Sequence, residues 1–543
     1  MLNLLPIKIS GKFNFLLLIL IFFSFTQIKS QIVYEDLNNP VYAFLEKLAV
    51  KKLIDLNLSV KPYSKKEIVN KLKVLKEGIS KLNKVEREEL DWYLKRYGLE
   101  NNKKVKILGE FDFLSSKFKF RAYPLAGYEI STTGSYNGYS KWIGARFEGS
   151  TGNISMMFEY IDTGEFGDNV DVQKNLTPET GHFIKYAPNG IEFSDVKGSI
   201  IYDFGIGSIA LKKNYVNWGS GKFGKLFLSS NAASFPHIEF KLQPASWFSL
   251  SYIHGWLNSL VLDSSRFYYS YQGNIQPFLV ETYINKYIAA NIISFKPYKW
   301  LTFSVGNSFI YSGDLRPEMF IPVMYFKVMD HNTGRGDVND GNGLIFFDFN
   351  TNYFKNINIY GSLLIDVLEI RSLLKGEFYK SWFGVTAGVS FVDVIIPNLD
   401  IFAEYSRLNP WLYENKYITT NYKHLGYVLG HWIGNNADLL SFQLNYKFIR
   451  SLNLSLKSEI FRKGGSEDIY YVYIERKKLP FLFGNNRYDF SIEFSALYNP
   501  LHNVYLKGKY KYSELTDEET QRTPAFLLGN KSSFILSVSY GFP

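Results

Sequence analysis

Residues 534–542, which read FILSVSYGF, decide the fold class of this chain. Every second residue from Phe534 to Phe542 is apolar, and the residues between them are mostly small or polar. Successive side chains of a β-strand point to opposite faces, so this strand has one wholly apolar face. An aromatic-rich strand one residue before the carboxyl end is typical of the closing strand of an outer-membrane barrel. The stretch therefore predicts a β-barrel embedded in a bilayer.

The same two-residue period continues through the chain from about residue 106 onward. Apolar sets that share one face include Ile238, Phe240 and Leu242; Leu301, Phe303, Val305, Phe309 and Tyr311; Leu452, Leu454 and Leu456; Ile492, Phe494 and Ala496. The opposite faces carry polar and charged residues, which are costly against lipid but tolerated in a hydrated lumen. We therefore expect an all-β membrane protein, in which residues 106–543 form a large antiparallel transmembrane β-barrel of roughly 16 to 20 strands. A large secreted β-sandwich is the alternative fold that the aromatic content also accommodates.

The beginning of the chain has the pattern of an export signal. Lys8 and Lys12 precede an apolar run at residues 13–25, and Ser30 offers a cleavage site before Gln31. The run is too short to span a bilayer as a helix. Residues 1–30 are therefore predicted to be a signal peptide.

Residues 31–105 change to a helical period and are predicted to form a small α-helical domain. Pro40 follows the candidate cap Asn39, and apolar residues recur after it at helical spacing. Two further helix starts are indicated by capping-box pairs, Ser64 with Glu67 and Asn83 with Glu86. Lysines on these helices are either solvated or available to an anionic partner: Lys65, Lys66, Lys71, Lys73 and Lys76.

The composition argues against several classes of protein. The chain has no cysteine, which excludes disulfides and thiol chemistry. Its net charge of +10 is carried mainly by the first 105 residues, and the remainder has mixed charges where a nucleic-acid-binding protein would have a basic stripe. The sequence has no G-x-S-x-G, H-E-x-x-H or phosphate-binding glycine loop. We therefore expect neither an enzyme, nor a cofactor, nor a nucleic-acid partner.

Trp218 is the first candidate for binding carbohydrate. It is followed by Gly219, Ser220 and Gly221, with Asn231 further on. An indole face stacks on the apolar side of a sugar ring, while hydroxyls and amides bond to the ring's rim. The alternative is a tight turn with Trp218 anchored at the membrane interface.

A second candidate group consists of His424, His431, Asn435, Asn436 and Asp438. These side chains supply the donors and acceptors that sugar hydroxyls require. The alternative is that they are lumen or turn residues that bond to one another. No metal site is expected, because adjacent strand residues point to opposite faces and fix no ligand triad.

One acidic stretch superficially resembles a calcium-binding loop. It begins at Asp337, but Asn342 stands where an EF-hand loop requires glycine. Asp348 stands at the twelfth position, where a bidentate glutamate is expected. The stretch is better explained as a polar surface loop.

Several segments resemble the Wzi family of outer-membrane capsule assembly proteins, in the form common among Bacteroidota-like bacteria. The helical part contributes residues 39–48, NPVYAFLEKL, which are similar to the family's opening helix. The barrel part contributes residues 217–221 with 226–233, and residues 430–438, GHWIGNNAD. Residues 310–313 and 360–366 lie between them and also look like family segments.

The resemblance implies an eighteen-stranded barrel with a periplasmic N-terminal helical bundle, acting as a lectin that retains capsular polysaccharide. We therefore expect a non-catalytic outer-membrane protein that binds and anchors, or helps assemble, capsular or exopolysaccharide. The expected partners are that polysaccharide, outer-membrane lipid and, as a further candidate, the polysaccharide export machinery. A diffusion porin or sugar-uptake channel is the first alternative, favoured by an open lumen, and a lipase-type barrel enzyme is the second.

Overall fold

The computed structural model describes most of the chain beyond its beginning. The described residues are 33–98, 109–115, 118–168, 170, 184–271, 277–332, 341–376, 381–466, 479–519 and 522–542. The predicted signal peptide, residues 1–30, lies outside them.

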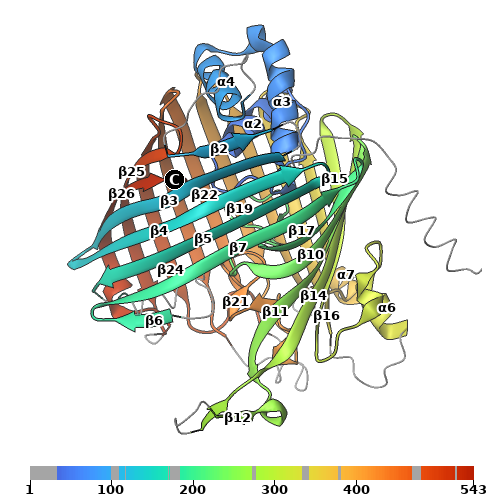
Figure 1. Cartoon of the computed structure of the whole chain (residues 1–543). Helices are drawn as coiled ribbons and strands as arrows, with labels where there is room; N and C mark the ends of the chain where they lie inside the picture. Colours follow the sequence, from blue (N-terminus) through green and yellow to red (C-terminus); the bar gives the residue numbers. More distant parts are fainter. Residues whose placement is uncertain are drawn as a thin grey trace, which may run out of the picture.

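Eighteen antiparallel strands form a closed barrel, and pairing of the last strand, β26, with β3 closes the ring (Figure 1). The number agrees with the one that the family resemblance implies. In order around the barrel the strands are β3 (Phe118–Thr133), β4 (Tyr136–Thr151), β5 (Ile154–Gly167), β7 (Gly190–Asp203), β8 (Gly207–Asn214), β10 (Phe235–Ala245), β11 (Phe248–Leu262), β14 (Tyr283–Tyr298), β15 (Leu301–Ser312), β16 (Asn342–Thr351), β17 (Ile357–Val367), β18 (Trp382–Val392), β19 (Leu399–Leu408), β22 (Ala437–Ile449), β23 (Leu452–Lys463), β24 (Arg487–Tyr498), β25 (Val504–Asp517) and β26 (Gly529–Tyr540).

Short elements decorate this wall. The strand β2 (Phe111–Leu114) extends the edge of β3, and β6 (Ile184–Ala187) pairs with β7. Three two-stranded sheets lie apart from the wall: β1 (Val60–Lys61) with β9 (Asn217–Trp218), β12 (Tyr268–Ser270) with β13 (Phe278–Val280), and β20 (Lys423–His424) with β21 (Tyr427–Val428). The helices of the described residues are α2 (Val41–Val50), α3 (Lys65–Glu77), α4 (Lys84–Arg96), α6 (Phe326–Asn332) and α7 (Ile370–Leu374), with short 3-10 turns at η1 (Ile79–Lys81), η2 (Ser264–Arg266), η3 (Pro317–Phe320), η5 (Ile418–Thr420) and η6 (Ala525–Leu527). None of these helices is long and apolar enough to cross a membrane.

The last strand confirms the predicted alternation, with one correction at its end. Phe534, Leu536 and Val538 are exposed on the outer surface, whereas Ser537 and Ser539 are buried on the inner side. The strand ends at Tyr540, because Gly541 has a φ of +106° and turns the chain. Phe542 therefore leaves the outer face and stacks on Trp142, with ring centroids 6.1 Å apart.

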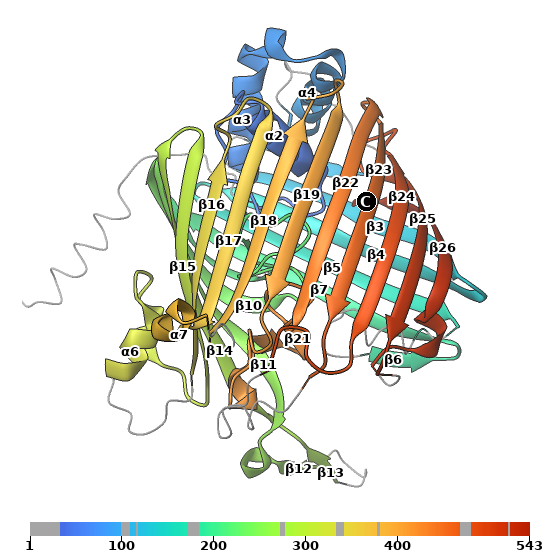
Figure 2. The same ribbon diagram turned by 180° about the vertical axis from the view of Figure 1, so that it is seen from behind.

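The two ends of the barrel differ in their connections. Short turns join the strands at the end that carries helices α2 to α4, and longer connections lie at the opposite end (Figure 2). We call these the cap end and the loop end. Exposed aromatic and apolar side chains occupy several cap-end turns and strand ends: Trp247, Tyr298, Tyr353, Phe354, Ile395 and Phe448. Such a girdle is typical of the interface between a barrel and one membrane surface.

The second and third helices form at the starts that the sequence predicts, and the first begins at Val41, one residue after the predicted Pro40. The Ser64 side chain accepts a hydrogen bond from the Glu67 backbone, and Asn83 with Glu86 forms a complete capping box. The Asn39 side chain accepts a hydrogen bond from the Val41 backbone at 3.0 Å. The three helices pack around an apolar core of their own: Val41, Phe44, Leu45, Leu48, Ile68, Leu72, Leu75, Leu90 and Leu94.

Ion pairs fix the helical cap to the barrel. Lys47 and Lys51 both bind Asp393, at 2.8 Å and 2.7 Å, in the turn between β18 and β19. Lys65 binds Glu148 of β4 at 2.5 Å, and Lys66 binds Asp203 of β7 at 2.9 Å. These last two lysines are therefore occupied by the barrel, unlike the solvated or partner-binding lysines that the sequence suggested.

Our first prediction concerns the outer face of the closing strand. Leu536→Arg places a charge against lipid, which costs about 2–4 kcal/mol near the bilayer midplane, so less protein should assemble. The matched change Ser533→Arg points to the inner face, where residue 533 is half-buried and pairs in register with Thr133 and Lys511. It should assemble normally. Heat-modifiable migration and membrane fractionation measure assembly, and equal assembly of both variants would contradict the assignment of the faces.

Our second prediction concerns the cap. Asp393→Asn removes the charge that binds Lys47 and Lys51, and losing such charge-assisted hydrogen bonds costs about 1–3 kcal/mol. Backbone amides of α2 should then exchange with deuterium faster, while those of β22 should be unchanged. Glu77→Gln, at an exposed position on α3, is the control and should change neither. Unchanged exchange in α2 of the Asp393 variant would show that this contact does not hold the cap.

Candidate functional site

Two long loop-end connections, residues 215–234 and 409–436, fold into the lumen and form what we call the plug. Side chains of both connections join one buried apolar cluster, which includes Trp218, Phe227, Leu412, Tyr413 and Tyr422. The cluster also contains inward side chains of the wall from β10 round to β23: Phe235, Ile253, Ile288, Ile310, Phe346, Leu364, Leu408, Leu439 and Phe461. On this side of the barrel the lumen is therefore a packed core.

Hydrogen bonds hold the two connections of the plug together. The hydroxyl of Tyr413 donates to the Leu226 carbonyl at 2.6 Å, and that of Tyr422 donates to the Phe227 carbonyl at 2.9 Å. Backbone pairing adds a bond from the Ser229 N–H to the Leu429 carbonyl at 2.8 Å. The two segments that carry most of the family resemblance thus meet face to face inside the barrel.

Carboxylates of the wall bind the backbone of the plug's glycine-rich turn. Asp348 accepts hydrogen bonds from the Ser220 backbone N–H at 3.0 Å and from its hydroxyl at 2.6 Å. Glu404 accepts from the backbone N–H groups of Lys222 and Phe223, at 2.6 Å and 3.1 Å. A buried backbone N–H without a partner is costly, so these two acids stabilise an irregular loop away from bulk water.

This turn requires glycines because the backbone conformation is unusual and neighbouring atoms lie very close to the Cα positions. Gly219 has a φ of +119°, a conformation that other residues rarely adopt. A Cβ atom on Gly221 would lie 2.0 Å from the Gly224 carbonyl oxygen, and one on Gly224 would lie 2.2 Å from the His431 ring. Glycine at these positions lets the two connections of the plug touch.

The N-terminal segment reaches the plug from the cap end. Strand β1 pairs with β9, which places Val60 opposite Trp218. The Ser59 hydroxyl donates to Asp348 at 2.5 Å, and the Gly219 N–H donates to the Ser59 carbonyl at 2.7 Å. Cap, plug and wall are therefore joined through one buried carboxylate.

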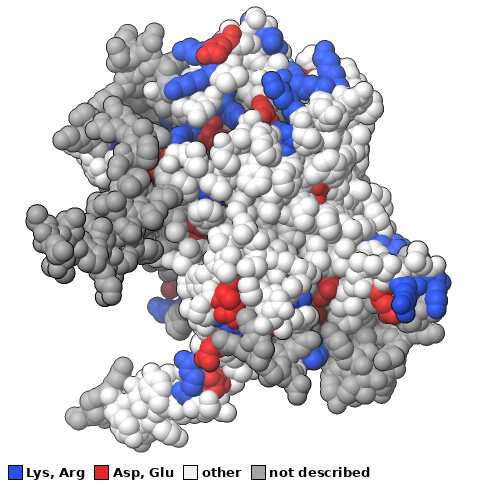
Figure 3. Space-filling model, turned by 90° about the vertical axis from the view of Figure 1, so that its right-hand side faces the viewer, with Lys and Arg blue, Asp and Glu red and all other residues white. Residues whose placement is uncertain are grey.

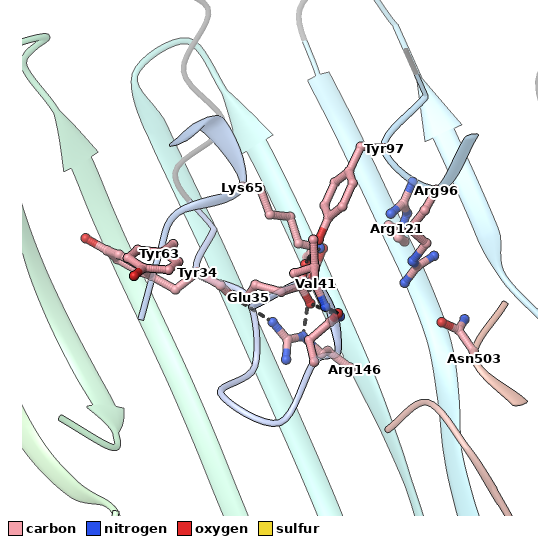
Figure 4. A network of polar contacts seen from close by, with 12 residues as sticks. Tyr34, Glu35, Val41, Tyr63, Lys65, Arg96, Tyr97, Arg121, Arg146 and Asn503 are labelled. Carbon is pink, nitrogen blue, oxygen red and sulfur yellow. Dashed lines mark hydrogen bonds and ion pairs between the residues drawn. The ribbon is translucent and has the colours of Figure 1, made fainter. Parts of the chain in front are cut away.

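A second polar network joins the N-terminal segment to the wall of β4 and β5. Arg146 donates to Glu148 at 2.9 Å and to the Tyr34 carbonyl at 2.9 Å. Figure 4 shows Lys65, Arg146 and Tyr97 gathered around Glu35, which accepts from the Tyr97 hydroxyl at 2.8 Å. Burial raises the pKa of the Glu35 carboxyl, but Lys65 and Arg146 outweigh burial and hold the pKa below its usual value. The network therefore carries paired charges and is suited to holding the cap in place.

The structure places Trp218 and Asn231 inside the plug. Trp218 has no exposed surface and lies with its ring centroid 6.0 Å from that of Phe227. The Asn231 amide donates to the Val428 carbonyl at 3.0 Å. Their side chains hold the plug together, and Trp218 lies in the lumen, away from the membrane interface that the sequence suggested as its alternative place.

The two predicted histidines are also buried in this region. His424 accepts a hydrogen bond from the Asn258 N–H at 3.0 Å, and His431 packs against Gly224. Burial lowers the pKa of His431 to about 3, so its ring is neutral at neutral pH. Both positions favour the interpretation that the two histidines are internal lumen or turn residues.

The remaining predicted residues lie around the start of β22. Asn435 is half-buried, and its backbone carbonyl accepts from the Lys463 ammonium at 2.8 Å. The Asn436 side chain donates to the Gly465 carbonyl at 2.9 Å and accepts from the Leu482 N–H at 2.8 Å. Asp438 binds Arg462 through two nitrogens, at 2.9 Å and 2.5 Å. Because Leu439 faces the plug core, its neighbour Asp438 lies on the other side of the wall and does not join the plug residues.

Sequence reasoning missed one accessible tryptophan and one group of accessible aromatic residues. Trp432 lies within the 430–438 segment, is 44% exposed, and donates from its indole nitrogen to the Phe223 carbonyl at 2.8 Å. It borders a lumen cavity of about 490 Å³ whose other walls include Gln443, Asn445, Ser455, Lys457, Glu459, Glu493 and Lys507. At the loop end, Tyr268, Tyr269, Tyr271 and Phe278 are exposed on the hairpin of β12 and β13. The signal for the hairpin was residues 267–271, FYYSY.

Within the described parts of the chain, no group of three or more metal-ligating side chains comes together. Most of the calcium-like stretch, residues 333–340, lies outside the described residues, and Asp348 is occupied by Ser59, Ser220 and Ser362.

Comparisons with known proteins give the family. The family model of the capsule assembly protein Wzi matches residues 197–526, which is more than half of the chain. A solved structure of Wzi from Escherichia coli, described as an outer-membrane protein involved in group 1 capsule assembly and as a carbohydrate-binding β-barrel, has a TM-score of 0.59 and 14% identity. That match covers 94% of this chain and 99% of the other.

Two further solved structures have lower TM-scores, and a search of curated sequences gave no match. Acinetobacter baumannii OccAB1 has a TM-score of 0.43 and 8% identity, covering 81% of this chain and 98% of its own. Pseudomonas aeruginosa OprD has a TM-score of 0.42 and 9% identity, covering 80% and 98%. The family match, the eighteen-stranded ring and the helices at one end agree with one another. This chain belongs to the Wzi family of capsule assembly proteins and is an outer-membrane β-barrel.

Proposed function

We propose that this protein binds capsular or exopolysaccharide at the cell surface without catalysis, and so anchors the polymer or helps assemble it. The observation that carries the proposal is the plug, which packs against the inner wall from β10 to β23. A diffusion channel requires a continuous aqueous path, whereas a binding protein needs only a rigid frame for its outer surfaces. The plug therefore favours the lectin over the porin, and family membership points the same way.

The hairpin of β12 and β13 is our candidate for the first contact with the polymer. It projects from the loop end, and the exposed fractions of Tyr268, Tyr269 and Tyr271 are 57%, 62% and 75%. Tyrosine rings offer an apolar face for a sugar and a hydroxyl for its rim. Each contact is weak, and a polymer that meets several such contacts gains its affinity by multivalency.

Trp432 is our second candidate. Its bond to Phe223 fixes the indole, and the cavity beside it is lined by amides, hydroxyls and charged groups. This combination suits a sugar ring. For Trp218, Asn231, His424, His431, Asn435 and Asn436 we propose an indirect role, because their contacts fix the plug and the loops around it. For Asp438 we propose that it orients Arg462, which is half-exposed, toward acidic groups of the polymer.

The placement of the N-terminal region is also a proposal. Residues 1–30 are assigned to the signal peptide, 31–105 to a helical domain and 106–543 to the barrel. Bacterial outer-membrane barrels have short periplasmic turns and longer extracellular loops, which supports a periplasmic position for the cap end. There the exposed lysines of α3 face the compartment of the export machinery, our further candidate partner. The Bacteroidota-type form of the family rests on the quoted sequence segments alone.

Our third prediction tests polysaccharide binding. Purified protein in detergent should retain high-molecular-weight polysaccharide from its own cells and show little affinity for the component monosaccharides. Replacing Tyr268, Tyr269 and Tyr271 by alanine together should lower polymer affinity about tenfold or more, if each ring contributes about 0.5–1.5 kcal/mol. Tyr498→Ala, an exposed tyrosine at the cap end, is the control and should leave affinity unchanged. If the wild-type protein itself does not retain the polymer, the proposed function is wrong.

Our fourth prediction tests the plug. Trp218→Ala removes a fully buried indole, a change that costs about 3–5 kcal/mol in a packed core. The plug should loosen, and planar-bilayer recordings should show larger or more frequent conductance than the wild type. Trp247→Ala, at an exposed cap-end position, should conduct as the wild type does. A large, steady conductance of the wild-type protein would favour the porin instead.

A further inference from the structure

The outer wall of the barrel carries a polar row where a membrane barrel normally presents apolar side chains. Tyr252 of β11, Asn291 of β14 and Asn307 of β15 are paired in register, so they lie side by side on one face. Phe303 and Val305 occupy the same face of β15 nearer the cap end, and both are exposed. The polar row therefore lies on the outer surface, above residues that meet lipid.

The height of this row places it within the membrane. Strand β15 begins at Leu301, beside Tyr298 and Trp300, whose stacked rings lie 5.0 Å apart at the cap-end girdle. At about 3.4 Å per residue and a tilt of about 40°, Asn307 lies about 16 Å above that girdle. The apolar band of such barrels is about 25 Å tall. Two bare asparagines at this level would be exposed to hydrocarbon.

Residues 313–332, the first part of the connection between β15 and β16, fold back over this row, and we call them the flange. Met319 and Phe326 of the flange are fully buried against Phe309 and Tyr311 of the wall, two residues that the sequence alone placed against lipid. In Figure 1 the flange helix α6 lies beside the barrel, outside the wall of β14 to β16.

Side chains of the polar row form hydrogen bonds with backbone groups in the irregular part of the flange. The Asn291 amide donates to the carbonyls of Pro322 and Met324, each at 2.9 Å. Asn307 donates to the Met324 carbonyl at 3.1 Å and accepts from the Phe326 N–H at 3.1 Å. The Tyr252 hydroxyl donates to the Met319 carbonyl at 2.7 Å. Non-helical backbone is tolerated at membrane depth only where such partners exist. The flange therefore needs the polar row, and the polar row needs the flange to shield it from lipid.

Three charged side chains of the flange have partners within it or beside it, whereas one buried carboxylate oxygen of Glu318 has no hydrogen-bond partner among the described residues. Arg316 and Asp330, near its two ends, form a buried ion pair at 2.6 Å. The ammonium of Lys327 bonds to the Gly341 carbonyl at 3.3 Å and lies over the Phe309 ring. Exposed polar residues of the flange, Asp314 and His331, lie toward its two ends.

The outward side of the flange is apolar. Its exposed side chains include Leu315, Ile321, Val323, Tyr325 and Val328, with Val323 exposed by 66%. Nearby in the figures, α7 and its flanks carry exposed Ile370 and Leu374 together with exposed Glu369, Arg371 and Lys375, so the apolar surface is that of the flange itself. In Figure 3 the surface directly below the charged cap is largely uncharged, and charged side chains reappear lower down, toward the loop end. The flange covers Phe309 and Tyr311, so its apolar outward side continues the row that Phe303 and Val305 begin on the lipid-facing wall.

We propose that the flange is a membrane-embedded part of the barrel, whose outer side contacts the acyl chains of the outer leaflet. It widens the barrel on the side of β11, β14 and β15 and holds a loop-end connection at a fixed depth in the membrane. The satisfied backbone, the buried Arg316–Asp330 pair and the continuity with the wall select lipid as the occupant over a protein partner or a second copy of this chain.

The absence of cysteine from the chain allows a direct test. Val323→Cys, and independently Ile321→Cys, are labelled with a polarity-sensitive nitrobenzoxadiazole dye in the full-length protein and reconstituted in phosphatidylcholine vesicles. Val305→Cys on the lipid-facing wall and Tyr269→Cys on the loop-end hairpin are the matched controls. Heat-modifiable migration checks that each variant is folded. The measurements are the emission maximum and quenching by phospholipids that carry a doxyl group on the acyl chain.

Dye at residues 321 and 323 should emit at the short wavelengths seen at residue 305 and be quenched by doxyl lipid as strongly. Dye at residue 269 should emit as in water and resist quenching. Water-like emission without quenching at both flange positions would overturn the proposal, because the flange would then lie above the membrane. Short-wavelength emission without quenching would also overturn it, because protein and not lipid would then cover the flange. Neither result depends on polysaccharide binding, so this test is separate from that of the proposed function.

Discussion

The interaction on which the rest of the structure depends is the binding of irregular backbone by polar side chains of the barrel wall. In the wall itself, strand pairing supplies the hydrogen bonds of the backbone, since a closed ring has no unpaired edge. The plug has no such ladder over most of its length. Asp348 and Glu404 supply the missing partners for Ser220, Lys222 and Phe223. Without these carboxylates, the glycine-rich turn would leave buried N–H groups unpaired in the lumen.

The outer surface uses the same solution with neutral groups. Asn291 and Asn307 bond to the backbone of the flange, where a carboxylate would be far more expensive to keep beside lipid. The inner wall holds its two buried acids through hydrogen bonds from the plug, whereas the outer wall uses amides and a tyrosine hydroxyl. The wall therefore determines the position of the plug on its inner side and of the flange on its outer side.

The cap completes this arrangement from the other end. Asp348 binds Ser59 as well as the plug, and Arg146 binds the N-terminal segment to β4 and β5. Movement of the cap would disturb the plug through these shared groups. A lectin benefits from such a frame, because weak contacts at several places on one polymer add up only if their spacing is maintained.

The alternation of apolar and polar residues, the helix caps and the missing cysteines were properties of the sequence by itself, and they determined a barrel with a few N-terminal helices. Local periodicity suffices for this, because the face of a strand depends only on whether a residue is at an odd or even position. The candidate site was only partly accessible to such reasoning. The segments around Trp218 and His431 were identified as special, but their packing against each other was not, and Trp432 beside His431 was passed over. Only the tertiary structure decided that one loop-end connection enters the lumen while another covers the outer wall at Phe309 and Tyr311. Those positions depend on contacts between residues far apart in the chain, such as Ser220 with Asp348 and Asn291 with Met324, which no local pattern encodes.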